Sequence, residues 1–349
     1  MAELLDPLNM GDLTLKNRLV LAPLTRARSG DDRIPNDLNV AYYRQRANAG
    51  LILTEATVIN PQAVGYAKTP GLYNQQQIEG WKKVVAAVHE QDAKIVVQLW
   101  HVGRISDPEL LQGQTPVSAS AVKAAGHVSL LRPKREYVTP RALSRDEIKQ
   151  IIADYKQAAI NAKAAGFDGV ELHAANGYLP DQFLQSKTNQ RDDEYGGSIE
   201  NRARFMLEIV DELIDVFGAG RVGVHLAPRC DAHDMGDSDP QATFGYVVDE
   251  LEKRHIAFIF SREYLAADSL SPLLRPRFSG VWIANENLTP ATAKQILAEE
   301  QFEAVAFGRA YIANPDLLDR LVNDLPLNVL NTKTIYTEGA EGYTDYPML

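Results

Sequence analysis

The feature that most constrains the fold is a series of short runs rich in apolar and β-branched residues, most of them followed by a stretch with helical periodicity. Eight such runs occupy residues 18–23, 51–56, 94–101, 168–173, 221–228, 257–261, 281–285 and 304–309. The clearest helical patterns occupy residues 146–165, 199–217, 242–254 and 290–300. Eight strands alternating with helices favour a closed parallel barrel. We therefore predict an α/β chain in which residues 1–349 form one (β/α)8 TIM-barrel domain.

The longest interval between these runs follows the third one. This segment, about residues 102–143, is rich in Pro, Ser, Gly and charged residues and has no helical pattern of its own. Long loops in barrels lie on the surface, so we expect an insertion that crosses the barrel mouth and not a separate domain. A doubly wound sheet is the alternative, but it normally has a glycine-rich turn after its first strand. Residues 22–26 read Ala-Pro-Leu-Thr-Arg there instead.

Composition excludes several classes of protein. The net charge is −10, and no basic cluster interleaved with aromatic residues is present, so nucleic acid is not an expected partner. No uncharged apolar run of about 18 residues occurs, which predicts a soluble cytoplasmic protein, a monomer or a weak homo-oligomer. The seven histidines form no metal-binding motif, so no metal is expected. The single cysteine, Cys230, excludes an internal disulfide and is expected to be a small loop residue.

Chemistry in such a barrel is found where the strands end. The polar and aromatic residues at these ends include Thr25, Gln98, Trp100, His173, Asn176, Tyr178 and Arg309. His173 and Asn176 are three residues apart and offer two donors to one carbonyl or nitro oxygen. Tyr178 follows in the loop, where its phenol could donate a proton. Taken singly, His173 could be an ordinary core histidine and Tyr178 a packed tyrosine with its hydroxyl in water.

Barrels usually bind phosphate with the loops after the last two strands. Here Gly308 permits close approach of the backbone and Arg309 brings a permanent cation. A terminal phosphate is therefore a reasonable ligand. The alternative is that Arg309 lies on a helix surface.

At these residues the chain resembles the Old Yellow Enzyme family, particularly its N-ethylmaleimide and pentaerythritol tetranitrate reductase branch. The resemblance runs along the whole chain in ordered blocks: Ala-Pro-Leu-Thr-Arg at 22–26, Gln-Leu-Trp-His at 98–101, Gly-Arg-Ile-Ser at 103–106, Ala-Gly-Phe-Asp-Gly-Val-Glu-Leu-His at 165–173, Asn-Gly-Tyr-Leu at 176–179, Ala-Val-Ala-Phe-Gly-Arg at 304–309 and Glu-Gly-Tyr-Thr-Asp-Tyr-Pro at 341–347.

The resemblance implies an FMN-dependent ene-reductase that takes electrons from NAD(P)H. Its substrates would be small electrophilic alkenes, namely enones, enals and maleimides, or nitro compounds. The two substrates would alternate at one place, which gives ping-pong kinetics.

The resemblance also implies a role for each site residue. Tyr178 would protonate the substrate α-carbon, and His173 and Asn176 would bind its oxygen. The pocket would be shaped by Tyr66, Trp100 and Tyr343. The cofactor-binding positions would be Pro23, Thr25, Ala56, Gln98, His225, Asn285, Gly308 and Arg309. Among these, Thr25 would contact the flavin O4, Ala56 and Gln98 its pyrimidine edge, and Arg309 the phosphate.

Several of these positions depart from the family pattern. The family ordinarily has an arginine facing the flavin N1 and O2 edge where this chain has His225, and an imidazole with a pKa near 6.5 is mostly neutral at pH 7. Glu286 brings a carboxylate close to the expected phosphate, and Phe260 replaces the usual histidine of the sixth strand. Arg262, two residues later, is a candidate for compensating charge. We therefore hypothesise that FMN affinity is lower than is usual for the family.

Two alternatives belong to other classes. One is a family member with weakened or lost FMN binding that acts as a non-catalytic binding protein, as His225, Phe260 and Glu286 would suggest. The intact set His173, Asn176 and Tyr178 argues against it. The other is a flavin-independent lyase or aldolase, which would need a lysine or a metal site at a strand end. No predicted strand ends in such a lysine.

Overall fold

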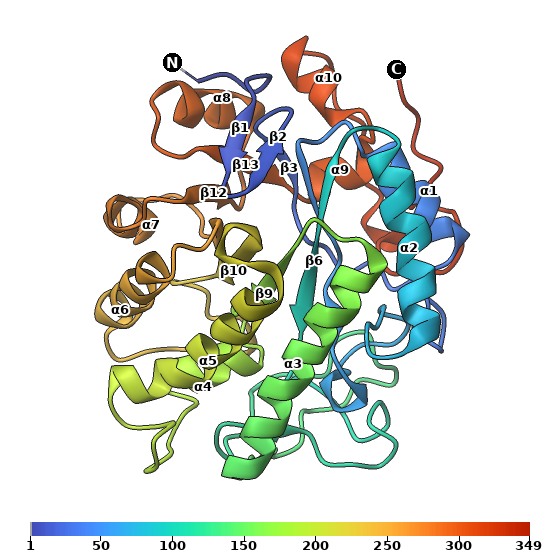
Figure 1. Ribbon diagram of the computed structural model, residues 1–349. Coiled ribbons are helices and arrows are strands. Elements are labelled where there is room, and N and C mark those ends of the chain that lie inside the picture. The colour runs from blue at the N-terminus through green and yellow to red at the C-terminus, as the bar shows by residue number, and fades with distance from the viewer. Residues whose placement is uncertain (1) are drawn as a thin grey trace.

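The computed structural model describes residues 2–349, and at its centre lies a closed barrel of eight parallel strands (Figure 1). The barrel strands are β3 (Leu19–Leu21), β4 (Leu51–Leu53), β6 (Lys94–Trp100), β9 (Gly169–His173), β10 (Val222–Leu226), β11 (Phe258–Arg262), β12 (Val281–Asn285) and β13 (Ala304–Phe307). They lie in the order β4-β3-β13-β12-β11-β10-β9-β6, and the pairing of β4 with β6 closes the ring. The (β/α)8 fold predicted from the sequence is confirmed. A short strand, β5 (Thr57–Val58), runs beside the end of β6.

Alternating side chains along each strand divide the core into two parts. On β11, Phe258 and Phe260 point into the barrel and pack with Val96 and Ile283, whereas Ile259 packs with the helices outside. This two-residue period is the ordinary geometry of a strand that is covered on both faces. A hairpin of β1 (Leu8–Met10) and β2 (Leu13–Leu15) adds apolar side chains to the barrel interior. Figure 1 shows it at the top, where it closes the amino-terminal end of the barrel.

The helices surround the barrel. They are α1 (Asp37–Gln45), α2 (Gln75–His89), α3 (Arg145–Ala165), α4 (Leu179–Leu184), α5 (Ile199–Phe217), α6 (Pro240–Lys253), α7 (Ser271–Leu274), α8 (Pro290–Ala298), α9 (Arg309–Ala313) and α10 (Leu317–Val322). The longest, α3, begins where Ser144 and Glu147 form a capping box and ends at Gly166, whose φ is 91°. The start and stop signals of the sequence thus agree with the observed bounds.

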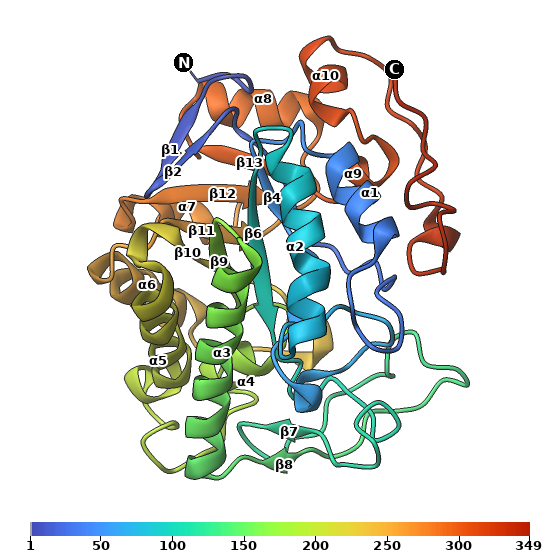
Figure 2. The ribbon, with the colours of Figure 1, turned by 45° about the vertical axis from the view of Figure 1, so that its right-hand side comes forward.

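The segment between β6 and α3 lies at the carboxyl end of the strands, which is the lower end in Figures 1 and 2. It contains the short pair β7 (Val117–Ser118) and β8 (Arg141–Ala142). Arg104 ties it to the barrel, because its guanidinium donates to the carbonyls of Val122 and His233, each at 2.9 Å. The predicted insertion after the third strand therefore contacts the loop that follows β10.

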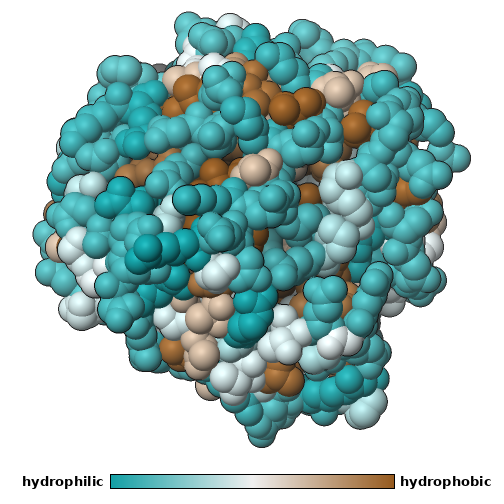
Figure 3. Space-filling view, turned by 60° about the horizontal axis from the view of Figure 1, so that its bottom comes forward, coloured by the Kyte–Doolittle hydropathy of each residue, from teal (hydrophilic) through white to brown (hydrophobic). Residues whose placement is uncertain are grey.

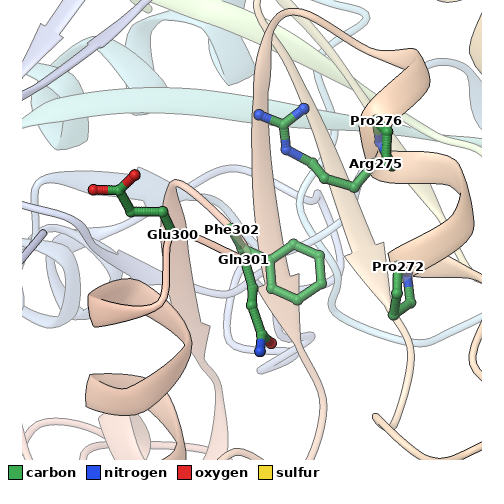
Figure 4. A pocket seen from close by; sticks show the side chains of 6 residues that line it. All are labelled: Pro272, Arg275, Pro276, Glu300, Gln301 and Phe302. Carbon is green, nitrogen blue, oxygen red and sulfur yellow. The ribbon is translucent and has the colours of Figure 1, made fainter. Parts of the chain in front are cut away.

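The two ends of the barrel differ in the surface that they present. Figure 3 turns the lower end toward the viewer, and that face is mainly hydrophilic with scattered apolar patches. Figure 4 shows a surface pocket of about 300 Å³ between α7 and the turn that precedes β13. Because Gln301 and Phe302 come before β13, this pocket is at the start of that strand. It is therefore not at the strand ends where barrel enzymes place their active sites.

Candidate active site

The ends of β6 and β9 bring four of the predicted site residues into one aromatic cluster. The rings of Tyr66 and Trp100 are stacked with centroids 5.4 Å apart, and Tyr178 meets Trp100 edge-on at 5.0 Å. His173 lies 4.9 Å from the Tyr178 ring. The hydroxyls of Tyr66 and Tyr178 are 3.1 Å apart and share a hydrogen bond. Residues far apart in the sequence thus form one aromatic cluster that contains a pair of hydrogen-bonded phenols.

Burial sets the protonation state of this cluster. Desolvation raises the pKa of Tyr66 to about 12 and that of Tyr178 well above its ordinary value. Desolvation, with a smaller contribution from the charge of Arg262, lowers the pKa of His173 to about 3. At neutral pH both phenols therefore carry their protons and the imidazole is uncharged. Tyr178 can act as a proton donor, and His173 offers a neutral imidazole whose buried Nδ1 has no partner within residues 2–349.

Asn176 is held at two points in the loop after β9. Its backbone is left-handed with φ of 58°, a conformation that asparagine tolerates better than most residues. His233 Nδ1 lies 2.6 Å from the Asn176 carbonyl, which fixes Nδ1 as the protonated nitrogen of that ring. Arg262 Nη1 donates to Asn176 Oδ1 at 2.8 Å. The side chain predicted to bind the substrate oxygen is therefore fixed in orientation.

His225, at the end of β10, is packed beneath this cluster. Its ring is parallel to that of His173, with centroids 5.0 Å apart, and contacts the ring of Phe260 at 4.4 Å. Gln98 Nε2 donates to His225 Nδ1 at 2.9 Å, and the same amide donates to Glu171 at 2.8 Å. The proton of His225 is therefore on Nε2, which is buried without a partner among the described residues.

Desolvation lowers the pKa of His225 well below its ordinary value, and the positive charge of Arg262 adds to this effect. The fifth strand therefore presents one neutral N–H donor. An arginine at this place would present a charged fork with five.

Glu286 has a partner that the sequence does not reveal. Its carboxylate accepts a hydrogen bond from Arg262 Nη2 at 2.9 Å, so its charge is directed to the end of β11. Next to it, Asn285 Nδ2 donates to the carbonyl of Ala306 at 2.9 Å and ties β12 to β13. This ion pair weakens the electrostatic repulsion that was expected between Glu286 and a phosphate. Arg262 thus places a cation beside Glu286, one of the positions that depart from the family pattern.

These residues can be tested against the shape and charge of FMN. At the ends of β3 and β13, Pro23, Thr25 and Gly308 are partly exposed and Arg309 is exposed, so this side is open to an anionic group. A side chain in place of Gly308 would meet the Leu24 side chain at 2.9 Å, so Leu24 would have to shift to admit it. After β4, the neighbour of β3, Ala56 is buried, and so is Gln98 on the next strand, β6.

His173 Nδ1 and His225 Nε2 are buried and have no hydrogen-bond partner among the described residues, so each can bond a polar group of a ligand. The described residues fit FMN, because the partly open side at Gly308 and Arg309 can accept a phosphate and the unpartnered nitrogens of His173 and His225 can bind polar ring atoms. His225 does not supply the permanent cation of the family pattern.

The structure places Tyr343 outside the aromatic cluster. Its ring is fully buried and stacks on Tyr42 with centroids 4.3 Å apart, and the guanidiniums of Arg26 and Arg28 lie over it at 4.9 and 4.5 Å. Its hydroxyl accepts a hydrogen bond from Asn39. Tyr343 thus anchors the carboxyl-terminal tail by packing, because its polar and apolar surfaces are both engaged there.

A different tyrosine of the tail lies near the pocket. Tyr336 is about half exposed and close enough to Tyr66 and Tyr178 to raise the pKa of both phenols. Sequence reasoning missed Tyr336, since the tail has no periodic pattern to indicate which of its tyrosines faces the mouth. No sequence signal points to Tyr336, because the path of residues 334–341 depends on the buried guanidinium of Arg28, which donates to several of their carbonyls.

Other site types find no support in the part of the chain that is described. Within residues 2–349, no group of three or more His, Cys, Asp or Glu side chains is arranged to hold a metal ion. Cys230 is partly buried, and desolvation raises the pKa of its thiol, which disfavours the reactive thiolate. A bilayer-spanning helix is also absent from residues 2–349, because none there is both long and apolar enough.

Comparisons with known proteins identify the family of this chain. The model of the NADH:flavin oxidoreductase / NADH oxidase family matches residues 3–328. The 12-oxophytodienoate reductase 1 of Oryza sativa subsp. japonica is 44% identical over 360 residues, covering 99% of this chain and 93% of the relative. A probable flavin mononucleotide-dependent alkene reductase of Leishmania infantum is 40% identical over 358 residues, covering 99% and 97%.

Solved structures of two relatives have the same fold as this chain. Morphinone reductase in complex with tetrahydroNAD superposes with a TM-score of 0.96 at 46% identity, covering 100% of this chain and 98% of that one. The Old Yellow Enzyme homologue from Zymomonas mobilis has a TM-score of 0.96 at 39% identity, covering 99% and 100%. The chain therefore belongs to the NADH:flavin oxidoreductase / NADH oxidase family, the family of the Old Yellow Enzyme homologues, and is an NAD(P)H-dependent flavin oxidoreductase.

Proposed function

We propose that this protein is an FMN-dependent ene-reductase that reduces the activated C=C bond of enones, enals, maleimides or nitroalkenes. The observation that carries the proposal is the buried contact between the neutral ring of His173 and the protonated phenol of Tyr178, with Asn176 held by Arg262 in the loop that joins them. The phenol of Tyr178 also shares a hydrogen bond with Tyr66. The relatives named alkene reductase and 12-oxophytodienoate reductase support the same reaction class.

The side chains divide the reaction between them. FMN, when bound, would supply hydride chemistry driven by a nicotinamide donor. The neutral ring of His173 and the amide of Asn176 hold the substrate carbonyl or nitro oxygen and stabilise the negative charge that develops there when hydride reaches the β-carbon. Tyr178 then gives its proton to the α-carbon, so that one hydride and one proton are added across the double bond. Tyr66, 3.1 Å away, can return a proton to the resulting phenolate.

FMN would be held by Gly308 and Arg309 at its phosphate and by Thr25, Gln98 and His225 at its ring system. The nicotinamide donor and the alkene would use the same pocket in turn, which gives ping-pong kinetics. The structure of morphinone reductase with a nicotinamide analogue supports a nicotinamide donor. We also propose that residues 1–349 work as one FMN-binding domain acting on small molecules.

The proposal is tested by separating the two half-reactions. The FMN-loaded protein is reduced with NADPH without oxygen and then mixed with 2-cyclohexenone. We expect the flavin to be reoxidised while an equal amount of cyclohexanone forms. Reoxidation by oxygen but not by a panel of enones, maleimides and nitroalkenes would reject the ene-reductase function. Initial rates at several concentrations of both substrates then give parallel double-reciprocal lines if the mechanism is ping-pong.

A further inference from the structure

Arg262 connects three elements at the barrel mouth. It is the last residue of β11, and its guanidinium donates to Asn176 Oδ1 in the loop after β9 and to Glu286 directly after β12. The two distances are 2.8 and 2.9 Å, and the side chains of Arg262 and Glu286 are 34% and 29% exposed. The predicted substrate-binding amide is thus linked to a charge pair that lies at two of the positions where the chain departs from its family pattern.

The chemistry of the groups fixes the orientation of the Asn176 side chain. A guanidinium has only donors, whereas a carboxamide has an acceptor oxygen on one side and a donor nitrogen on the other. The contact with Arg262 therefore requires Asn176 Oδ1 to face Arg262 and directs the two N–H bonds of Nδ2 away from it. The carbonyl of Asn176 is held separately by His233. Without Arg262, the amide could turn over and present an acceptor to a substrate oxygen, which would repel it.

Glu286 makes this contact from a strained backbone position. It has φ of 100°, a conformation that is unfavourable for a residue with a side chain. Its carboxylate neutralises Arg262 beside His173 and His225, two buried imidazoles that are destabilised in their charged forms by that guanidinium. A cation can remain near these rings because its counter-ion is adjacent. The ion pair with Glu286 also orients the guanidinium of Arg262 so that its Nη1 points at Asn176.

We propose that Arg262 is a positioning residue for the substrate-oxygen site, acting by fixing the amide of Asn176 as a hydrogen-bond donor, and that Glu286 holds Arg262 in place. This inference rests on the proposed function for the identity of the bound oxygen. It predicts a site that prefers an oxygen carrying negative charge, as in an enolate, nitronate or phenolate. It assigns Arg262 and Glu286 a shared role at the pocket in place of a role at the phosphate.

The probe is 4-nitrophenol, whose absorbance reports its ionisation without any contribution from turnover. Bound to the oxidised holoenzyme, it should ionise at a lower pH than in solution. We expect Arg262→Met to weaken phenolate binding at least about tenfold and to raise the pKa of the bound phenol. Arg262→Lys keeps a donor and should recover part of the loss, and Glu286→Gln should show a smaller loss than Arg262→Met. Arg229→Met is the matched control, because Arg229 pairs with Glu263 and Asp268 instead.

A double-mutant cycle distinguishes positioning from a direct charge effect. If Arg262 acts through Asn176, then Asn176→Ala combined with Arg262→Met should bind the phenolate as weakly as Asn176→Ala alone. Fully additive losses, or unchanged binding in Arg262→Met, would overturn the proposal. The proposal would also be overturned if Arg262→Met lost FMN but its FMN-loaded fraction bound 4-nitrophenol like the wild-type protein. Wild-type protein that binds no phenolate would overturn it as well. If the wild-type protein did not reduce enones, the proposed function would be refuted, but the phenolate-binding measurements could still be interpreted because they do not depend on turnover.

Discussion

Replacement of His225 by arginine should tighten FMN binding. His225 is almost fully buried at the end of β10, where its Nε2–H has no partner among the described residues. A neutral hydrogen bond from this group contributes about 0.5–1.5 kcal/mol, and a charge-assisted one about 1.5–3 kcal/mol. The gain from His225→Arg is then about 0.5–2 kcal/mol, or about 2- to 30-fold in Kd. The nearby Arg262 reduces this gain little, because Glu286 neutralises it.

The assay is a titration of apoprotein with FMN, followed by quenching of flavin fluorescence, in wild-type protein, His225→Arg and His225→Gln. The glutamine variant removes the imidazole without adding charge, so its Kd should not fall. A cation at this position should also stabilise the reduced flavin and raise its reduction potential by about 20 mV for each 1 kcal/mol. If His225→Arg melts like wild-type protein but leaves both Kd and potential unchanged, the fifth strand does not limit FMN binding and the reasoning is wrong.

Three further predictions concern the site and its support. Tyr178→Phe should slow reoxidation of the flavin by an enone at least about 100-fold but leave its reduction by NADPH nearly unchanged in stopped-flow traces; equal slowing of both would exclude proton donation. Burial lowers the pKa of His101 to about 3, so below about pH 6.5 the unfolded chain takes up a proton that the folded one does not. As the pH is lowered below about 6.5, this proton uptake decreases the unfolding free energy by up to about 1.4 kcal/mol per pH unit, and His101→Gln should show a shallower pH dependence in urea unfolding. Arg28→Met removes the donors to the carbonyls of Thr334, Ile335 and Glu341, and should lower the unfolding free energy by at least about 2 kcal/mol and speed hydrogen exchange in residues 334–341; unchanged exchange would refute the anchoring role.

The barrel was predictable because local patterns determine its elements. Each strand is a short apolar run, and each long helix has its own start and stop signals, as at Ser144 and Gly166. The grouping of Trp100, His173 and Tyr178 followed from the same logic, since parallel strands end at one rim. These inferences needed only periodicity and chain order.

The contacts between strand ends were not predictable in the same way. The sequence suggested that Glu286 would face a phosphate, but its partner is Arg262, because the two residues extend from neighbouring strands at the same level. The bond from Arg262 to Asn176 spans 86 positions and depends on where the side chains point. For the tail, similarity to a motif suggested Tyr343, whereas the bonds of Arg28 place Tyr336 near the pocket.

The most direct test of the account is the visible absorption spectrum of the freshly purified protein, recorded with and without added FMN. The account predicts a bound yellow chromophore, saturable by added FMN if some is lost in purification, that NADPH bleaches and an enone restores. A colourless protein that also fails to bind added FMN would contradict it, since the changes at His225, Phe260 and Glu286 would then have abolished the cofactor site.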